Sequence, residues 1–279
     1  MDITPAQSLH AVSATALNAL LGGAQSPRLL DVRKAPAFDA AEFTLPAALR
    51  CAPEQVPDQF DRLRGKQVVT CCVHGHQVSQ NAAQTLREAG IDARFLADGI
   101  EGWHGAGLPT MRKLTDCGVP ATFGQPSRWI TRERPKIDRI ACPWLIRRFI
   151  DPEAQFFYVP ADQVSARAVS MNAIAYDVPG VRFSHRAEAC SFDAFIADFG
   201  LRDSGLDSLA AIVRGADTGQ PGLTPQSAGL LAISLGLSVN FHDDHAMLEH
   251  GMVVYDALYA WLRTAAREVH NADLFRKNP

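Results

Sequence analysis

The sequence predicts an α/β domain, with a parallel sheet and flanking helices, followed by a mainly helical α+β domain. Apolar β-type runs alternate with helical patterns as far as residue 112, which is typical of strands joined by helices. A stretch rich in proline and glycine then interrupts the pattern. Helical spacing of apolar residues dominates beyond it. We therefore expect a first domain at 1–112, a linker at 113–129 and a second domain at 130–279.

The elements of the first domain follow from local patterns. Runs of apolar residues without alternation predict buried strands, and apolar residues at a spacing of three and four predict helices. Gly90 follows the second helix and is a residue type common after a helix C-terminus. Because helices connect successive strands, we expect a parallel sheet. The expected elements are helices at 13–21 and 80–89 and strands at 28–32, 68–72 and 93–96.

The second domain contains more helical than strand patterns. Ser191 and Thr224 are expected N-caps, and Pro225 and Pro143 each suit the first position of a helix. The expected elements are helices at 143–150, 191–199, 225–235 and 244–264 and short strands at 155–159 and 181–184.

Composition excludes several classes of function. The net charge of -3 and the lack of a basic block disfavour nucleic acid and membrane surfaces as partners. No run approaches the roughly 20 apolar residues that span a bilayer, and the N-terminus lacks the pattern of a secretory signal. Six scattered cysteines without paired spacing fit a reduced compartment. We therefore expect a cytoplasmic protein.

The segment VVTCCVHGHQVSQNAA at 68–83 predicts a nucleophilic cysteine. A strand ends there, a short loop follows and a helix begins, so the Cys72 thiol faces backbone N–H groups and a helix N-terminus, which stabilise a thiolate. Cys71 is expected to point to the other face of the sheet. The alternative is that Cys72 is a small buried core residue. The expected substrate-binding loop comprises Val73, His74, Gly75, His76, Gln77, Val78 and Ser79.

The first domain resembles the rhodanese sulfurtransferases. The resemblance rests on the segments LLDVR, CVHG and FLADGIEGWHGAGLP. The resemblance implies that Cys72 takes sulfur from a small donor such as thiosulfate, holds it as a persulfide and passes it to a thiol or cyanide, with no cofactor required. The loop is one residue longer than is usual in that family. Related phosphatases place an arginine six residues after the cysteine, where this chain has Val78, so phosphatase chemistry is not expected.

Two segments of the second domain contain potential metal ligands. On a helix at 244–264, His245 and Glu249 lie four residues apart on one face, and a strand end carries His185 and Glu188. If His185 met His245 and Glu249, a three-ligand site for a divalent metal would result. The alternative is a hydrogen-bonded His–Glu pair on a solvated face, with Met247, Val254, Leu258 and Trp261 packed in the core.

The segment KIDRIACPWLIRR contains a second candidate thiol. With Pro143 as the first helical residue, Cys142 would be the capping residue and would be partly ionised by the helix N-terminus and by Arg139. Its alternative is a neutral thiol buried beside Trp144.

The second half resembles the C-terminal domain of ChrB-type chromate-resistance proteins. The resemblance rests on the segments RERPKIDRIACPWLIRRFIDP, FSHRAEACSFDAF and LAAIVRGADT. The resemblance implies a role in chromate resistance, with Arg139 and Arg147 as charge partners for chromate or a related oxyanion.

The leading hypothesis is a sulfurtransferase or thiol enzyme acting through Cys72, coupled to chromate resistance by an oxyanion- or metal-binding second domain. The intact cysteine loop favours this hypothesis. The alternative is a non-catalytic chromate or metal sensor with a degenerate rhodanese domain, which the altered loop length favours. A third reading is metal-dependent hydrolysis or redox chemistry in the second domain alone.

Overall fold

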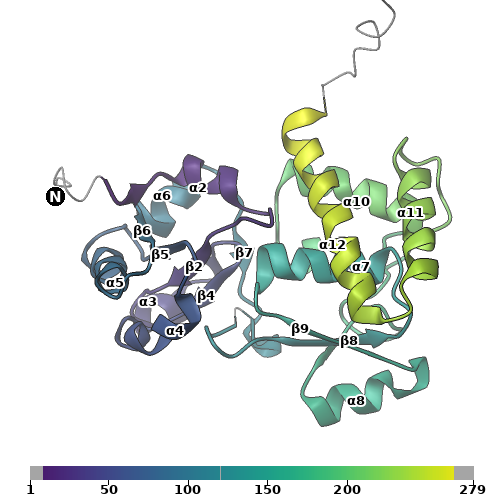
Figure 1. Ribbon diagram of the computed structural model, residues 1–279, viewed down its shortest axis with the longest axis horizontal. Coiled ribbons are helices and arrows are strands. Elements are labelled where there is room, and N and C mark those ends of the chain that lie inside the picture. Colours follow the sequence, from purple (N-terminus) through teal and green to yellow (C-terminus); the bar gives the residue numbers. More distant parts are fainter. Residues whose placement is uncertain (1–8, 120, 267–279) are drawn as a thin grey trace, which may run out of the picture.

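The computed structural model describes residues 9–119 and 121–266. Two units lie side by side (Figure 1): an α/β unit, coloured purple to blue, and a mainly helical unit, coloured teal to yellow. The expected α/β domain followed by a mainly helical α+β domain is confirmed.

The first unit is built on a five-stranded sheet with strand order β1-β6-β5-β2-β4, in which all neighbouring strands are parallel. The three central strands are short apolar runs whose residues are almost all buried, as in sheets covered on both faces. The strands are β1 (Ala11–Val12), β2 (Arg28–Asp31), β4 (Ala48–Arg50), β5 (Val68–Cys71) and β6 (Ala93–Leu96).

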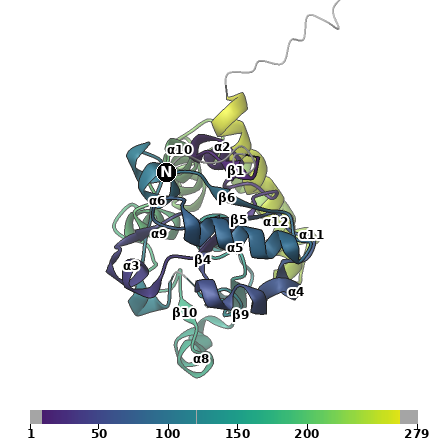
Figure 2. The same ribbon diagram turned by 90° about the vertical axis from the view of Figure 1, so that its left-hand side faces the viewer.

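Helices cover both faces of this sheet. On one face, α2 (Ala14–Leu20) and α6 (Gly99–Gly105) pack against Val69 and Cys71 of β5. On the other, α4 (Phe60–Leu63) and α5 (Gln77–Glu88) pack against Val68 of the same strand and against Cys72. Figure 2 shows α5 in front of the sheet. Alternate residues therefore enter two separate cores, and Cys71 and Cys72 belong to opposite faces, as expected from strand geometry.

The second unit combines a three-stranded parallel sheet, of order β10-β8-β9, with six α-helices in its described part. Its core is rich in aromatic side chains, among them the fully buried Trp129 and Trp144. The strands are β8 (Arg128–Arg132), β9 (Gln155–Val159) and β10 (Ile174–Ala175). The helices are α7 (Asp138–Leu145), α8 (Val164–Met171), α9 (Ser191–Phe199), α10 (Ser204–Asp217), α11 (Ser227–Asn240) and α12 (Asp244–Ala260). Two π-helical segments, η4 (Ile146–Ile150) and η6 (Trp261–Ala265), extend α7 and α12.

The two units contact each other directly. The N–H of Ala47 donates to the carbonyl of Phe149, 2.6 Å away. The guanidinium of Arg263, in η6, donates to the carbonyl of Leu21 at 2.9 Å. The segment expected to be a linker packs into both cores, since Phe123 lies in the core of the first unit and Leu114 in that of the second.

Several expected element boundaries are wrong. Helix α7 begins at Asp138 rather than Pro143, which lies inside it, and α5 begins at Gln77 rather than residue 80. The helix expected at 225–235 runs from Ser227 to Asn240. The strand expected at 181–184 is not formed, and the segment makes only an isolated β-bridge, between Phe183 and Tyr176. In each case tertiary packing fixes a boundary that local propensity does not.

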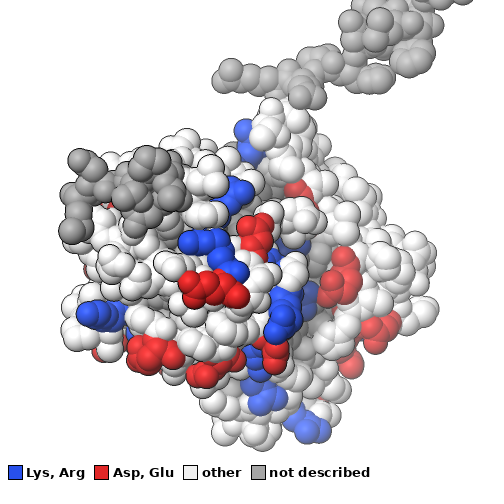
Figure 3. Space-filling view, turned by 60° about the vertical axis from the view of Figure 1, so that its left-hand side comes forward, with Lys and Arg blue, Asp and Glu red and all other residues white. Residues whose placement is uncertain are grey.

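The surface carries both signs of charge. On the face shown in Figure 3, basic and acidic side chains are interspersed rather than gathered into a large patch of one sign. Within the described part of the chain, no helix combines the length and the apolar character needed to cross a bilayer.

Candidate functional sites

Cys72 lies between the end of β5 and the start of α5. Its sulfur is 3.1 Å from the hydroxyl oxygen of Ser79, in the first turn of α5, and 4.0 Å from the carbonyl oxygen of His76. The first N–H groups of a helix have no acceptors within the helix, so this end of α5 favours negative charge. The residue is only 6% exposed. The sulfur therefore occupies a sheltered position at the N-terminus of α5, beside the Ser79 hydroxyl, which itself donates to the carbonyl of His76 at 3.2 Å.

The loop after Cys72 is held by the start of α6. The N–H of Ile100 donates to the carbonyl of Cys72 at 2.9 Å, and that of Glu101 to the carbonyl of Val73 at 3.0 Å. Gly75 has φ +69°, and a Cβ there would overlap the carbonyl oxygens of Leu96 and Ala97. Glycine is required at this position because both the backbone angle and the space exclude a side chain.

The substrate-binding residues predicted from the sequence divide into two groups. Val73, His74, Gly75 and His76 form the loop, with both histidine side chains exposed and their rings 5.8 Å apart. The other three, Gln77, Val78 and Ser79, belong to the first turn of α5 instead.

The neighbouring Cys71 is unsuited to nucleophilic chemistry. It is fully buried, and its thiol donates to the carbonyl of Leu30 at 3.5 Å. Burial, followed by the nearby carboxylate of Asp31, raises the pKa of Cys71 well above its usual value. Cys71 therefore stays protonated at neutral pH, which leaves Cys72 as the nucleophile candidate of this pair.

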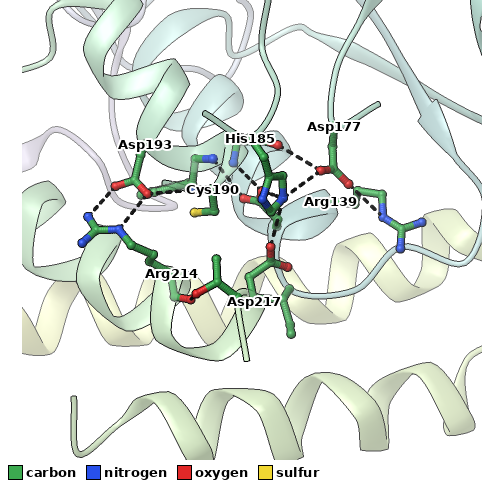
Figure 4. Close-up of polar contacts among 12 residues, drawn as sticks. Arg139, Asp177, His185, Cys190, Asp193, Arg214 and Asp217 are labelled. Atoms are coloured by element: carbon green, nitrogen blue, oxygen red, sulfur yellow. Dashed lines mark hydrogen bonds and ion pairs between the residues drawn. The ribbon is translucent and has the colours of Figure 1, made fainter. Parts of the chain in front are cut away.

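A second cluster lies in the mainly helical unit, where three aspartates surround His185. Figure 4 shows two of them, Asp177 and Asp217, beside the histidine ring. Nε2 of His185 is 3.5 Å from a carboxylate oxygen of Asp138, 3.3 Å from one of Asp177 and 3.2 Å from one of Asp217. Asp138 opens α7, Asp217 ends α10, and the other two lie in the loops between β10 and α9. We call these four residues the aspartate cluster.

Backbone and side-chain donors fix the carboxylates of the cluster from outside. Asp138 accepts hydrogen bonds from the N–H groups of Ser191 at 2.7 Å and Phe192 at 3.0 Å. Asp177 accepts from the hydroxyl of Ser191 at 2.9 Å and forms ion pairs with Arg132 and Arg139. The cluster is therefore a rigid arrangement rather than a set of free surface carboxylates.

The buried carboxylates repel one another. Burial, and then the charges of Asp217 and Asp177, raise the pKa of Asp138 to about 8. Burial and Asp177 likewise raise the pKa of Asp217. Without a compensating cation, at least one of these groups tends to hold a proton near neutral pH.

The predicted set of metal ligands is not assembled. His185 faces the aspartate cluster, whereas Glu249 pairs with Arg147 at 2.6 Å. The ring of His245 contacts Tyr158 edge-on, with ring centroids 5.5 Å apart, and the side chain of Glu188 is exposed. The prediction was wrong because it placed α12 beside the His185 loop, while the Glu249 face of α12 lies against η4.

The expectations for Cys142 and the two arginines also change. Cys142 is fully buried inside α7 and donates to Asp138 at 3.4 Å. Burial, followed by the charge of Asp138, raises its pKa well above the usual value, so the neutral alternative holds and the capping role is wrong. Arg139 pairs with Asp177 and Arg147 with Glu249, so the two guanidinium groups serve separate carboxylates.

Sequence reasoning did not identify three members of the cluster, Asp138, Asp177 and Asp217. They occur in the segments KIDR, DVPG and GADT, which are far apart in the chain. No helix or strand was expected to begin or end at any of the three, and only the fold brings their segments together.

The first unit has the architecture of a thiol-dependent α/β domain, with a cysteine between a central parallel strand and a helix N-terminus. Residues 13–106 match the family of rhodanese-like domains, and residues 129–262 match the C-terminal domain of ChrB. The chain therefore contains a rhodanese-like domain followed by a ChrB C-terminal domain.

Individual relatives cover only parts of the chain. Protein ChrB of Cupriavidus metallidurans is 35% identical over 136 residues, which is 48% of this chain and 40% of that protein. A rhodanese-related protein from Thermoplasma volcanium is 22% identical, covering 36% of this chain and 96% of the other, with a TM-score of 0.32. A thiosulfate sulfurtransferase from Pseudomonas aeruginosa is 24% identical, covering 36% of this chain and 19% of the other, with a TM-score of 0.32.

Proposed function

We propose that this protein transfers sulfane sulfur through a persulfide on Cys72 and acts in chromate resistance. The observation that carries the proposal is the position of the Cys72 sulfur at the N-terminus of α5, 3.1 Å from the hydroxyl of Ser79. That hydroxyl can donate to a thiolate, and the helix dipole lowers the energy of the same anion.

The reaction divides into two displacements. The thiolate of Cys72 attacks the outer sulfur of thiosulfate, a new S–S bond forms, and sulfite leaves with the electrons of the broken S–S bond. An acceptor nucleophile such as a thiolate or cyanide then attacks the outer sulfur of the persulfide, and the Cys72 thiolate is the leaving group. Ser79 and the first turn of α5 stabilise the thiolate at the start and at the end of this cycle.

The link to chromate resistance is supported by the match of residues 129–262 to the ChrB C-terminal domain. In this proposal the second domain binds an oxyanion or a metal ion and the first supplies sulfur chemistry. Contacts between the domains, such as the hydrogen bond between Ala47 and Phe149, keep the two proposed sites in one molecule at a fixed separation.

The test measures thiosulfate-dependent formation of thiocyanate from cyanide, with mass spectrometry of the protein. We expect a gain of one sulfur atom on Cys72, and loss of both adduct and turnover in Cys72→Ser. Cys71→Ser is the matched control, because the neighbouring thiol is buried and a hydroxyl can also donate to Leu30. Turnover that survives in Cys72→Ser, or absence of an adduct with every sulfane donor tried, would reject the proposal.

A non-catalytic sensor is the second candidate, and the 6% exposure of Cys72 favours it. A thiol this sheltered can respond to oxidation without meeting a sulfur donor. The two functions differ in one observable: a sensor binds chromate or metal with affinity that depends on the redox state of Cys72 and shows no turnover.

A further inference from the structure

We propose that Asp138, Asp177 and His185, with the carboxylate of Asp217 beside them, form a binding site for one divalent first-row transition metal cation. This inference deepens the proposed ligand-binding role of the second domain, and it is independent of sulfur transfer by Cys72. At this position the second domain would bind a cation rather than an oxyanion.

The distances between donor atoms fit a single ion. Ligand atoms of Asp138, Asp177 and His185 all lie within 4.8 Å of one another. Oxygen and nitrogen donors bind such ions at about 2.1 Å, so donors at right angles are about 3 Å apart. The carboxylate oxygens lie 3.2 to 3.5 Å from Nε2 of His185, close to that spacing.

The negative charges of the aspartate carboxylates at the centre of the cluster favour binding of a cation. Arg132 and Arg139 both pair with Asp177. For Asp138 and Asp217, the described residues provide no Lys or Arg ion pair, and Arg139 acts on Asp217 only from a greater distance. A bound divalent ion would compensate two carboxylates whose proximity is otherwise unfavourable.

The second observation is a cavity of about 620 Å³ that is lined by Asp177, His185 and Arg132, among others. His185 is 41% exposed in its side chain, whereas Asp138 is 2% exposed. The cluster is therefore closed on the side of α7 and open on the side of His185. An ion can enter through the cavity and keep a coordination position for water or a further ligand.

The donor set decides the class of metal. Two carboxylates and one imidazole are hard to intermediate ligands, which suit Mn²⁺, Fe²⁺ or Zn²⁺ more than Cu⁺. Cys142 and Cys190 lie close by, but among the described residues the ligand atoms that come together here include no sulfur, and the Cys142 thiol donates to Asp138 at 3.4 Å.

The competing interpretation is that an N–H at Nε2 of His185 donates to the carboxylates around it. In that case the cluster is complete without a metal. The two interpretations predict opposite results when metal is added, because a ring nitrogen that carries a hydrogen toward the centre has no lone pair for a metal there.

The test titrates Mn²⁺ into the full chain after chelator treatment, in a Cys72→Ser background, and measures free Mn²⁺ by electron paramagnetic resonance. We expect one ion per chain, bound at least tenfold more weakly by Asp177→Asn and by His185→Gln. Glu188→Gln is the matched control, since it removes an exposed carboxylate from the same loop. It should bind like the parent.

Thermal unfolding keeps the test interpretable if a variant folds poorly. An ion that binds only the folded state stabilises it by an amount that grows with the logarithm of the ion concentration relative to Kd, so Mn²⁺ should raise the unfolding temperature of the parent and the Glu188 variant but of neither ligand variant. Failure of the parent to bind Mn²⁺ or Zn²⁺, or equal binding by all four proteins, would overturn the site. Either result leaves the sulfur-transfer assay of the unmodified protein unaffected, so the two proposals fail separately.

Discussion

The carboxylate of Asp256 on α12 accepts two hydrogen bonds from the guanidinium of Arg148 in η4, both 2.8 Å long. The same carboxylate accepts a third, from the indole N–H of Trp144 at 2.8 Å. Both charged side chains are about four-fifths buried. Asp256 therefore joins α12 to α7 and η4 through one partly dehydrated ion pair, the geometry in which an arginine and a carboxylate interact most strongly.

Asp256→Ala should lower the free energy of unfolding by about 2–4 kcal/mol, because it leaves the Arg148 guanidinium and the Trp144 N–H without their partner. Asp61→Ala is the control, since Asp61 and Arg64 form an exposed pair worth about 0–1 kcal/mol. Urea denaturation followed by tryptophan fluorescence measures both. Equal effects of the two substitutions would show that burial adds nothing to the Asp256 contacts.

Gly75→Ala should distort the Cys72 loop and abolish sulfur transfer. A Cβ at residue 75 would overlap the carbonyl oxygens of Leu96 and Ala97, and φ is +69°. Gly90→Ala is the matched control, because its φ is +79° but no atom lies within 4 Å of the added Cβ. The control should lose about 1 kcal/mol of stability from the backbone angle and keep full activity. A fully active Gly75→Ala would contradict the proposed role of the loop.

Alkaline pH should destabilise the protein partly through Cys51. Burial raises its pKa to about 11 from the usual 9.0, so between these values the unfolded chain loses a proton that the folded chain keeps. The protonated Cys51 thiol therefore contributes its full stabilisation below pH 9, and this contribution is lost as the pH rises toward 11. Each unit of difference between the folded and unfolded pKa corresponds to about 1.4 kcal/mol.

Urea denaturation at pH 8, 9 and 10 checks this expectation. Cys51→Ala should show a shallower fall in stability with pH than the parent, whereas Cys117→Ala should change the slope less, because Cys117 is only half-buried. Parallel pH profiles for the parent and Cys51→Ala would refute the assignment.

Local patterns identified the three central strands of the first domain but not its edge strands β1 and β4. The strand at Val68–Cys71 and the helix after it were expected from residues adjacent in sequence, and alternation along β5 placed Cys71 and Cys72 on opposite faces. The start of α5 was misplaced by three residues, since the packing of Ser79 beside Cys72 draws those residues into the helix.

The second domain shows where such reasoning stops. The face of α12 that was expected to bind metal through Glu249 also carries Asp256, and these two carboxylates pair with Arg147 and Arg148 instead. Val254 and Leu258, expected in the core, are only partly buried, whereas Tyr255 is fully buried. A helix with apolar residues on more than one side does not indicate which side faces the core, and long-range packing against α7 and α10 decides it.

Arg263 should control how firmly the two domains are held together. Its guanidinium donates to the carbonyls of Leu21 at 2.9 Å and Asn18 at 3.0 Å, at the C-terminal end of α2, where the Asn18 carbonyl also accepts from the N–H of Leu21 at 3.3 Å. The positive charge also lies at the negative end of the α2 dipole. Arg263→Ala should therefore weaken both the end of α2 and its contact with η6 by about 1–2 kcal/mol.

Hydrogen exchange measured by mass spectrometry separates this effect from general loss of stability. Amides of α2 should exchange at least about tenfold faster in Arg263→Ala, which corresponds to about 1.4 kcal/mol, while amides of β5 in the centre of the sheet keep the parent rate. Arg167→Ala is the control, since Arg167 is exposed on α8. Unchanged exchange in α2 would mean that contacts such as Ala47 with Phe149 are sufficient to hold the domains, and acceleration in α2 and β5 alike would indicate global destabilisation rather than loss of a domain contact.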